Sequence, residues 1–162
     1  MITTTFEAIR DGYIAVIRAA LPRRFSEVRY DFVADESLVA WATRMPASTV
    51  FRKCEFLSVG ETPPQSPVIE PSAQERRQLA VLTVAYPVLE NLVGPDKYRE
   101  LEDVMRDDAA QLHDKLFWSG NYQTGQSACM VTIAAPTRIN PQLYLQTLSL
   151  QIDFYETTTL GA

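Results

Sequence analysis

The side chains that most often carry out chemistry in proteins are few in this sequence and far apart. His113 is the one histidine, and Cys54 and Cys129 are the two cysteines, so no CxxC, HxxxH or HExxH zinc pattern occurs. The six glycines are too dispersed for a GxGxxG or P-loop phosphate cradle, and GxSxG is absent. We therefore expect no metal site, no cofactor and no catalytic residues, and a protein that is not an enzyme.

A group of aspartates and an arginine pair are the remaining candidates for chemistry. Asp103, Asp107 and Asp108 could form an acid–base pair or a cation site, but acids at i and i+4 on an exposed helix face are common, and we favour a solvated face. Arg23-Arg24 could clamp a phosphate, whereas basic residues at a helix end more often interact with its free carbonyl groups. His113 lies at the edge of an apolar helix stripe and is interpreted as a boundary residue.

The charge of the chain argues against nucleic acid as a tightly held ligand. The 15 lysine and arginine residues and 20 aspartate and glutamate residues give a formal net charge of −5. Residues 1–77 hold ten acids and ten bases, whereas residues 78–162 hold ten acids and five bases. Gripping phosphates needs clustered lysine and arginine, so DNA could pass this protein but is not expected to be held by it.

Export and membrane insertion are not expected. No apolar run reaches the roughly 18 residues of a membrane-spanning helix. The segment Met1–Glu7 lacks the basic and apolar regions of a signal peptide. We therefore expect synthesis in the cytoplasm and two reduced, partly buried cysteines.

The hydrophobic periodicity predicts one α+β domain over residues 1–162. Two amphipathic helices are expected, from the capping box Thr4-x-x-Glu7 to Pro22 and over Lys97–Trp118. Five segments read as strands: Val28–Val33, Val50–Val59, Arg76–Tyr86, Ala128–Ala134 and Leu143–Glu156. This order predicts a mainly antiparallel sheet with both helices packed on one face.

Several finer expectations follow from local patterns. Arg76–Tyr86 is apolar at both parities, which indicates a central strand covered on both faces. Trp118–Gln126 is expected to be a loop, and Pro136–Pro141 a turn. Residues 157–162 are expected to form a short mobile tail.

A proline-rich stretch divides the predicted strands. Glu61–Ser72 carries four of the ten prolines, which fix φ, remove amide donors and bias their neighbours to extended conformations. Such a segment cannot join a helix or the interior of a sheet. We expect an extended arm over residues 61–74 that reaches a neighbouring molecule.

Three features resemble the tail terminator proteins of long-tailed bacteriophages, which cap the finished tail tube as a ring at its head-proximal end. The first is the N-terminal helix ending at Leu21-Pro22. The second is the strand Leu79–Pro87, which runs into Tyr86-Pro87 and is followed by a helix with Asp107-Asp108. The third is the terminal hairpin that closes in Leu148–Glu156.

The resemblance implies a homohexameric ring in the virion tail neck, without enzymatic activity, that contacts the tail tube protein below and a neck or connector protein above. DNA would pass through the ring without specific binding, and an acidic channel would repel it. The acids that we expect to face the channel are Glu100, Asp103, Asp107, Asp108 and Asp153. The arm residues expected to bridge subunits or rings are Pro63, Pro64, Pro67, Val68, Ile69 and Pro71.

Two other functions remain open at this point. A head-to-tail adaptor or stopper would also be a small α+β neck protein with arms. A small-ligand-binding or enzymatic domain could use Tyr86, His113 or Asp107 if distant residues converged on a pocket.

Overall fold

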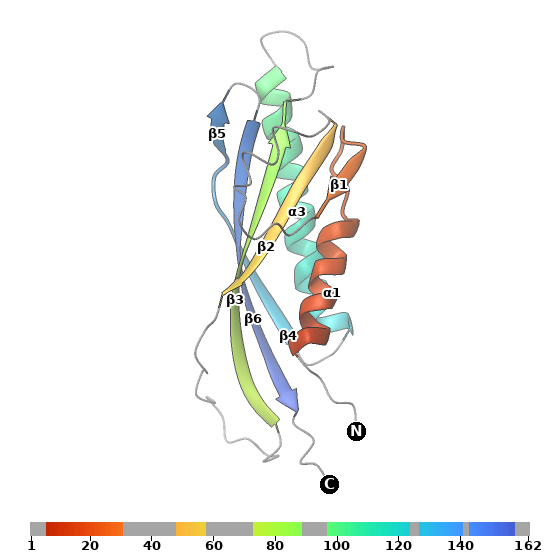
Figure 1. Cartoon of the computed structure of the whole chain (residues 1–162), viewed down its shortest axis with the longest axis vertical. Coiled ribbons are helices and arrows are strands. Elements are labelled where there is room, and N and C mark those ends of the chain that lie inside the picture. The colour runs from red at the N-terminus through yellow and green to blue at the C-terminus, as the bar shows by residue number, and fades with distance from the viewer. Residues whose placement is uncertain are drawn as a thin grey trace.

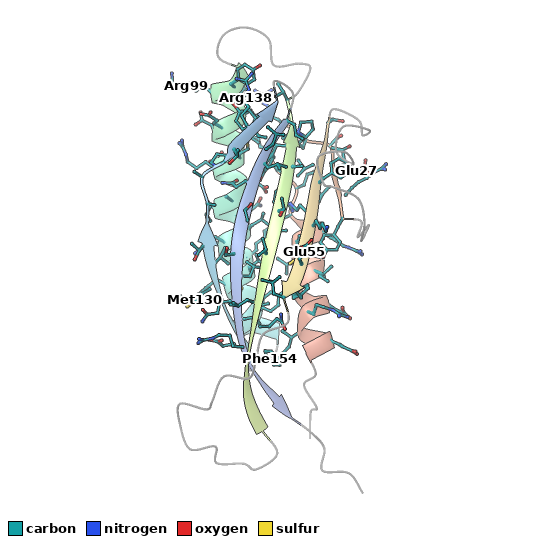
Figure 2. The ribbon with its side chains drawn as sticks, turned by 60° about the vertical axis from the view of Figure 1, so that its left-hand side comes forward. Glu27, Glu55, Arg99, Met130, Arg138 and Phe154 are labelled. Atoms are coloured by element: carbon teal, nitrogen blue, oxygen red, sulfur yellow. The ribbon has the colours of Figure 1, made fainter. Side chains whose placement is uncertain are left out.

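The chain folds into two helices on a six-stranded sheet, as seen in a computed structural model that describes residues 6–30, 48–57, 73–88, 97–123, 127–140 and 143–157. Figure 2 shows both helices behind the sheet, on the same face of it. The predicted α+β class and the helices on one face are therefore confirmed. In chain order the elements are α1 (Phe6–Ala19), β1 (Glu27–Arg29), β2 (Thr49–Leu57), β3 (Ala73–Pro87), α3 (Lys97–Gln123), β4 (Ser127–Ile133), β5 (Thr137–Asn140) and β6 (Leu143–Thr157).

The two longest strands, β3 and β6, lie in the middle of the sheet (Figure 1). They pair antiparallel from Ala73↔Thr157 to Pro87↔Leu143. The strand order is β1-β2-β3-β6-β4, and among the described strands β1 and β2 form the one parallel pair. β5 also pairs with β6, beside its first residues, so β4 and β5 form one edge that is interrupted at Ala134–Pro136. Pro136 has no amide hydrogen to donate, which accounts for a break in pairing at this point.

The alternation of side chains on β6 separates a buried face from an open one. Tyr144, Leu148, Leu150, Ile152 and Phe154 are all buried, together with Gln146, as the period-two pattern predicts. Ala80, Leu82, Val84 and Tyr86 of β3 continue this face. The helices complete the core with Ile9, Tyr13 and Ile17 of α1 and with Leu101, Met105, Leu112 and Leu116 of α3.

The prediction that β3 is covered on both faces is confirmed at one end of the strand and wrong at the other, within the described residues. On the face opposite the helices, Ala85 and its partner Phe51 are 0% exposed, whereas Val81 and Thr83 are half-buried and Leu79 is 37% exposed. The open part of this face therefore lies toward Leu79 and does not include the end of β3 near Tyr86.

Four details of the segments also differ from expectation. β3 begins at Ala73, so residues 73 and 74 of the predicted arm pair with β6, and Thr157 of the predicted tail pairs with Ala73. α3 continues to Gln123 through the expected loop, because a single glycine inside a helix costs only about 1 kcal/mol. β5 lies within the expected turn, because Thr137–Asn140 follow Pro136 in the sequence and pair with β6. Residues 61–72 and 158–162 lie outside the described residues.

We predict that Leu148→Ala lowers the free energy of unfolding by about 2–5 kcal/mol, because it opens a cavity in the centre of the core. Thr147→Ala is the matched control, on the open face of the same strand, and should cost about 1 kcal/mol or less. Urea denaturation followed by circular dichroism measures both values. Equal losses would contradict the assignment of the two faces.

Candidate functional site

A fully buried ion pair joins the two layers of the fold. The side chains of Arg52 on β2 and Asp108 on α3 are both 0% exposed. Arg52 Nη2 donates to Asp108 Oδ1 at 2.7 Å and to Oδ2 at 2.9 Å. Arg52 Nη1 donates to the carbonyl oxygens of Ile17 at 2.5 Å and Ala20 at 2.6 Å, and the hydroxyl of Tyr86 donates to Asp108 Oδ2 at 2.6 Å. One guanidinium and one carboxylate thus connect α1, β2, β3 and α3.

Each member of this network is placed by the regular geometry of its element. Arg52 lies opposite Val84 and between Val50 and Cys54, so the alternation of β2 directs its side chain toward the helices. The last carbonyl groups of a helix have no partner within it, so the end of α1 offers acceptors to a cation. Arg52 takes this role, whereas Arg23 and Arg24 form exposed ion pairs with Asp107 at 3.0 Å and Glu100 at 2.9 Å.

The network anchors the fold and is not suited to catalysis. Tyr86 is fully buried, and burial, followed by the neighbouring charge of Asp108, raises the pKa of its phenol well above the usual value. The phenol therefore stays protonated and serves as a hydrogen-bond donor. Asp108 is 1% exposed, so the prediction that it faces a channel is wrong. Its charge is held in the core because Arg52 compensates it there.

The other four predicted acids are exposed or half-buried but do not share one surface. Glu100, Asp103 and Asp107 follow one another along the outer side of α3, and Arg106 lies 3.5 Å from Asp103. Asp153 lies on the opposite face of the sheet, where it binds Arg77 at 2.8 Å. The structure therefore divides these candidates between two sides of the molecule, and an arginine neighbours each of them.

Arg52 was not among the site residues predicted from the sequence, although its side chain, like that of Asp108, is 0% exposed. The sequence does contain an indication of its role, because Arg52 occupies a position at which the alternation of the strand predicts a buried, apolar side chain. His113 is 44% exposed, with Nδ1 3.2 Å from Asp114 Oδ1, at the boundary of the α3 stripe. The candidate arm residues, Pro63, Pro64, Pro67, Val68, Ile69 and Pro71, lie outside the described residues.

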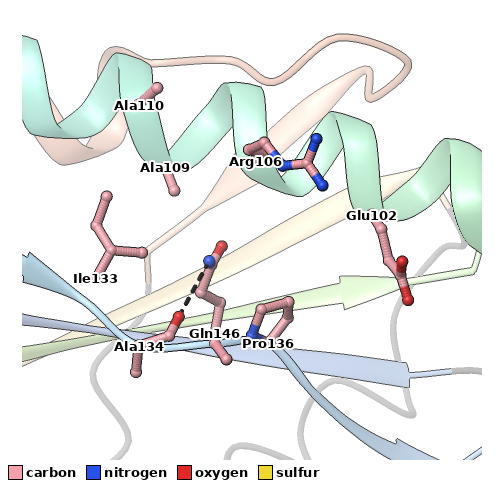
Figure 3. A pocket seen from close by; sticks show the side chains of 9 residues that line it. Glu102, Arg106, Ala109, Ala110, Ile133, Ala134, Pro136 and Gln146 are labelled. Atoms are coloured by element: carbon pink, nitrogen blue, oxygen red, sulfur yellow. Dashed lines mark hydrogen bonds between the residues drawn. The ribbon is translucent and has the colours of Figure 1, made fainter.

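A groove opens between α3 and the interrupted edge of the sheet, with a volume of about 520 Å³ (Figure 3). Its floor includes Gln146, which is 4% exposed and whose Nε2 donates to the carbonyl oxygen of Ala134 at 3.3 Å. Gln146 Oε1 has no hydrogen-bond partner among the described residues. Arg106 and Glu102 stand along the α3 wall, and Ala109, Ala110, Ile133 and Pro136 give the groove an apolar lining.

The cysteines Cys54 and Cys129 are free and buried in the core. Burial raises the pKa of each thiol to about 12, and neighbouring groups add to this, Cys129 for Cys54 and Asp153 for Cys129. In the described ranges, no three His, Cys, Asp or Glu side chains gather as metal ligands. Neither described helix combines the length and the hydropathy needed to cross a membrane.

No model of a known protein family matches the sequence, and no curated protein matches it either.

We predict that Asp108→Ala lowers the free energy of unfolding by about 3–5 kcal/mol, because it leaves the buried charge of Arg52 uncompensated. The adjacent, exposed Asp107→Ala is the matched control and should cost less than about 1 kcal/mol. The double variant Arg52→Met/Asp108→Leu should recover much of the loss, since both charges leave the core. Urea denaturation tests all three, and a similar cost for Asp107→Ala and Asp108→Ala would contradict the anchoring role.

We also predict that neither thiol reacts with Ellman's reagent in the folded protein at pH 8. A thiol with a pKa of about 12 is almost entirely protonated at that pH, and the thiolate is the reactive form. Both should react in denaturant, and Cys129→Ala should then leave one reactive thiol per chain. Rapid modification of the native protein would show that a thiol is more accessible than the structure indicates.

Proposed function

We propose that this protein is a structural component of a bacteriophage tail neck: a ring that caps the tail tube, ends its polymerisation and joins the tail to the head. The observation that carries the proposal is the contact between two segments on which the resemblance rests. Tyr86, where β3 runs into Pro87, donates its hydroxyl to Asp108 of the Asp107-Asp108 pair on α3. These segments therefore act together as one structural unit, as expected if they are a signature of the fold.

A structural role also agrees with how the polar groups are used. The acid, phenol and cation that lie closest together are those of Asp108, Tyr86 and Arg52. Each of these residues is at most 1% exposed, and both Tyr86 and Arg52 bind Asp108. Such groups cannot reach a substrate. We therefore propose that the protein has no enzymatic activity and works through its surfaces.

The open face of the sheet supports assembly with other protein chains. Leu57 is opposite Leu79, Leu79 is opposite Gln151, and Gln151 is opposite Met130, so one row crosses four strands. Its three apolar members are exposed: Leu57 is 42% exposed, Leu79 37% and Met130 65%. Exposed apolar side chains gathered in this way are typical of protein–protein contacts. We propose that this face meets the tail tube or a neck protein in the virion.

Within the ring, the acids on the outer side of α3 remain our candidates to face the DNA channel, namely Glu100, Asp103 and Asp107. Asp153 lies on the other face of the sheet and would face a protein partner if α3 faced the channel. Arg23, Arg24 and Arg106 neighbour the three α3 acids, so this surface would be close to neutral locally. A structure of the ring with arginines alone lining the channel would contradict this orientation.

We predict that the purified protein forms a ring with a mass near that of a homohexamer, about 110 kDa for chains of 18.3 kDa. Light scattering after size exclusion gives the mass, and electron microscopy shows the ring. The position of labelled protein in assembled particles then distinguishes a tail terminator from an adaptor or stopper. A monomer at all concentrations that also fails to bind tail tubes would contradict the proposal.

The proline-rich arm provides a further test. β2 ends at Leu57, opposite Leu79, whereas β3 begins six residues earlier, at Ala73, about 20 Å further along the sheet. The connection between β2 and β3 has to span this distance, so a test variant must keep its length. We predict that replacing residues 62–71 by a Gly-Ser segment of equal length preserves the circular dichroism spectrum and weakens ring formation or tail attachment. Unchanged assembly would rule out a bridging arm.

A further inference from the structure

We infer that the outer edge of β4, with the groove beside it, binds an extended strand from a second copy of this chain. This inference rests on the self-assembly in the proposed function and deepens it by naming the contact surface. Two independent features carry it: the outward backbone groups of β4, which pair with no strand in the described ranges, and a buried acceptor in the groove.

β4 has a neighbouring strand on one side only, β6, within the part of the chain that the structure describes. The backbone amide of Ala134 donates to the carbonyl of Thr147 at 2.9 Å, so Ala134 directs its backbone groups toward β6. Because these directions alternate along an antiparallel strand, the backbone N–H and C=O groups of Cys129, Val131 and Ile133 point outward. They form a row of donors and acceptors that one more strand would satisfy.

β4 itself lacks the features that keep sheet edges apart, although Pro136 and Arg138 follow it on the same edge. Natural edge strands are protected by charged side chains, proline, bulges or very short length. Residues 127–137 contain no charged residue, and β4 has no proline. Met130 is 65% exposed and Ile133 is 41% exposed, and Figure 2 shows Met130 at the outer edge of the sheet. An uncharged, apolar edge of this kind is suited to being covered by a partner strand.

The groove contributes a specific requirement. Gln146 Oε1 is buried without a hydrogen-bond partner among the described residues, and Figure 3 shows it directed toward α3, on the groove side. Leaving such an acceptor unsatisfied is costly, so an N–H donor from an incoming chain would be bound there. Ala109, Ala110 and Pro136 leave space for a small side chain beside that donor.

The self-assembly in the proposed function makes another copy the source of the strand, and the groove offers it a cation. Arg106 stands on the groove wall, 79% exposed, and lies 3.5 Å from its neighbour Asp103. An exposed acid of the incoming copy could also bind Arg106, which would offset part of the repulsion between chains that each carry a formal net charge of −5. In a ring, β4 of each copy would contact a different surface of the next copy, because a head-to-tail contact closes a ring whereas β4-to-β4 pairing closes a dimer.

The test compares edge variants with a control at another exposed apolar residue. Ile133→Pro removes an outward N–H and leaves pairing with β6 in place, and Met130→Lys puts a charge on the edge. Both should raise the dissociation constant of the assembly at least tenfold. Leu21→Lys, at a site 48% exposed near the end of α1, should leave it unchanged. Masses come from light scattering, and circular dichroism checks folding; if Ile133→Pro does not fold, Met130→Lys decides.

The outcomes separate this inference from the proposed function. A wild-type ring that both edge variants still form would overturn the inference and leave the ring intact. A wild-type dimer lost in the edge variants would support the edge contact and contradict the ring. A wild-type monomer at all concentrations would overturn both.

The groove has its own test. Gln146→Met removes the unpartnered acceptor and also the Nε2 donor of the bond to the Ala134 carbonyl, so the folded monomer should lose some stability, and assembly should weaken in addition. Loss of monomer stability with unchanged assembly would show that Gln146 has only a structural role and would overturn the part of the inference that concerns the groove.

Discussion

The ion pair between Arg52 and Asp108 is the constraint on which the rest of the structure depends. Removing two charges from water is costly, and the attraction between them compensates only when further hydrogen bonds complete the site. Here those bonds come from the carbonyl groups at the end of α1 and from the hydroxyl of Tyr86, and Arg52 Nε alone of the guanidinium nitrogens has no partner among the described residues. Both helices and both strands must therefore hold their positions closely, or a charge in the core loses its partners. The network specifies how α1 and α3 lie on the sheet.

This constraint also explains which surfaces remain for function. Because the pair binds α1 and α3 on one face of the sheet, the other face is accessible in part: Leu57, Leu79 and Ser149 are exposed there, whereas Phe51 and Ala85 are fully buried. The same arrangement leaves β4 at an edge, where α3 covers its inner face but nothing described continues the sheet. Under the proposed function, these accessible surfaces would contact other chains.

Much of this fold could be predicted from the sequence, because the spacing of apolar residues in the long elements matches the spacing of their buried positions. The alternation of β6 and the stripe of α3 identified the buried residues directly. The network could not be predicted in this way, because Asp107 and Asp108 are chemically identical neighbours. Successive helix residues differ by about 100° in direction, so one carboxylate enters the core while the other meets solvent. The partner that decides between them, Arg52, lies far away in the sequence and becomes a neighbour only through β2.

The same long-range pairing changes the meaning of the net charge. Along the sequence, the excess of acid falls entirely in residues 78–162, which suggested a strongly acidic surface. In the fold, four arginines from residues 1–77 bind acids from the second part, in the pairs Arg23–Asp107, Arg24–Glu100, Arg52–Asp108 and Arg77–Asp153. The asymmetry along the chain is therefore largely cancelled in space at these positions. A channel built from α3 would let DNA slide because Arg23, Arg24 and Arg106 are each paired with an acid, more than because the surface repels phosphates.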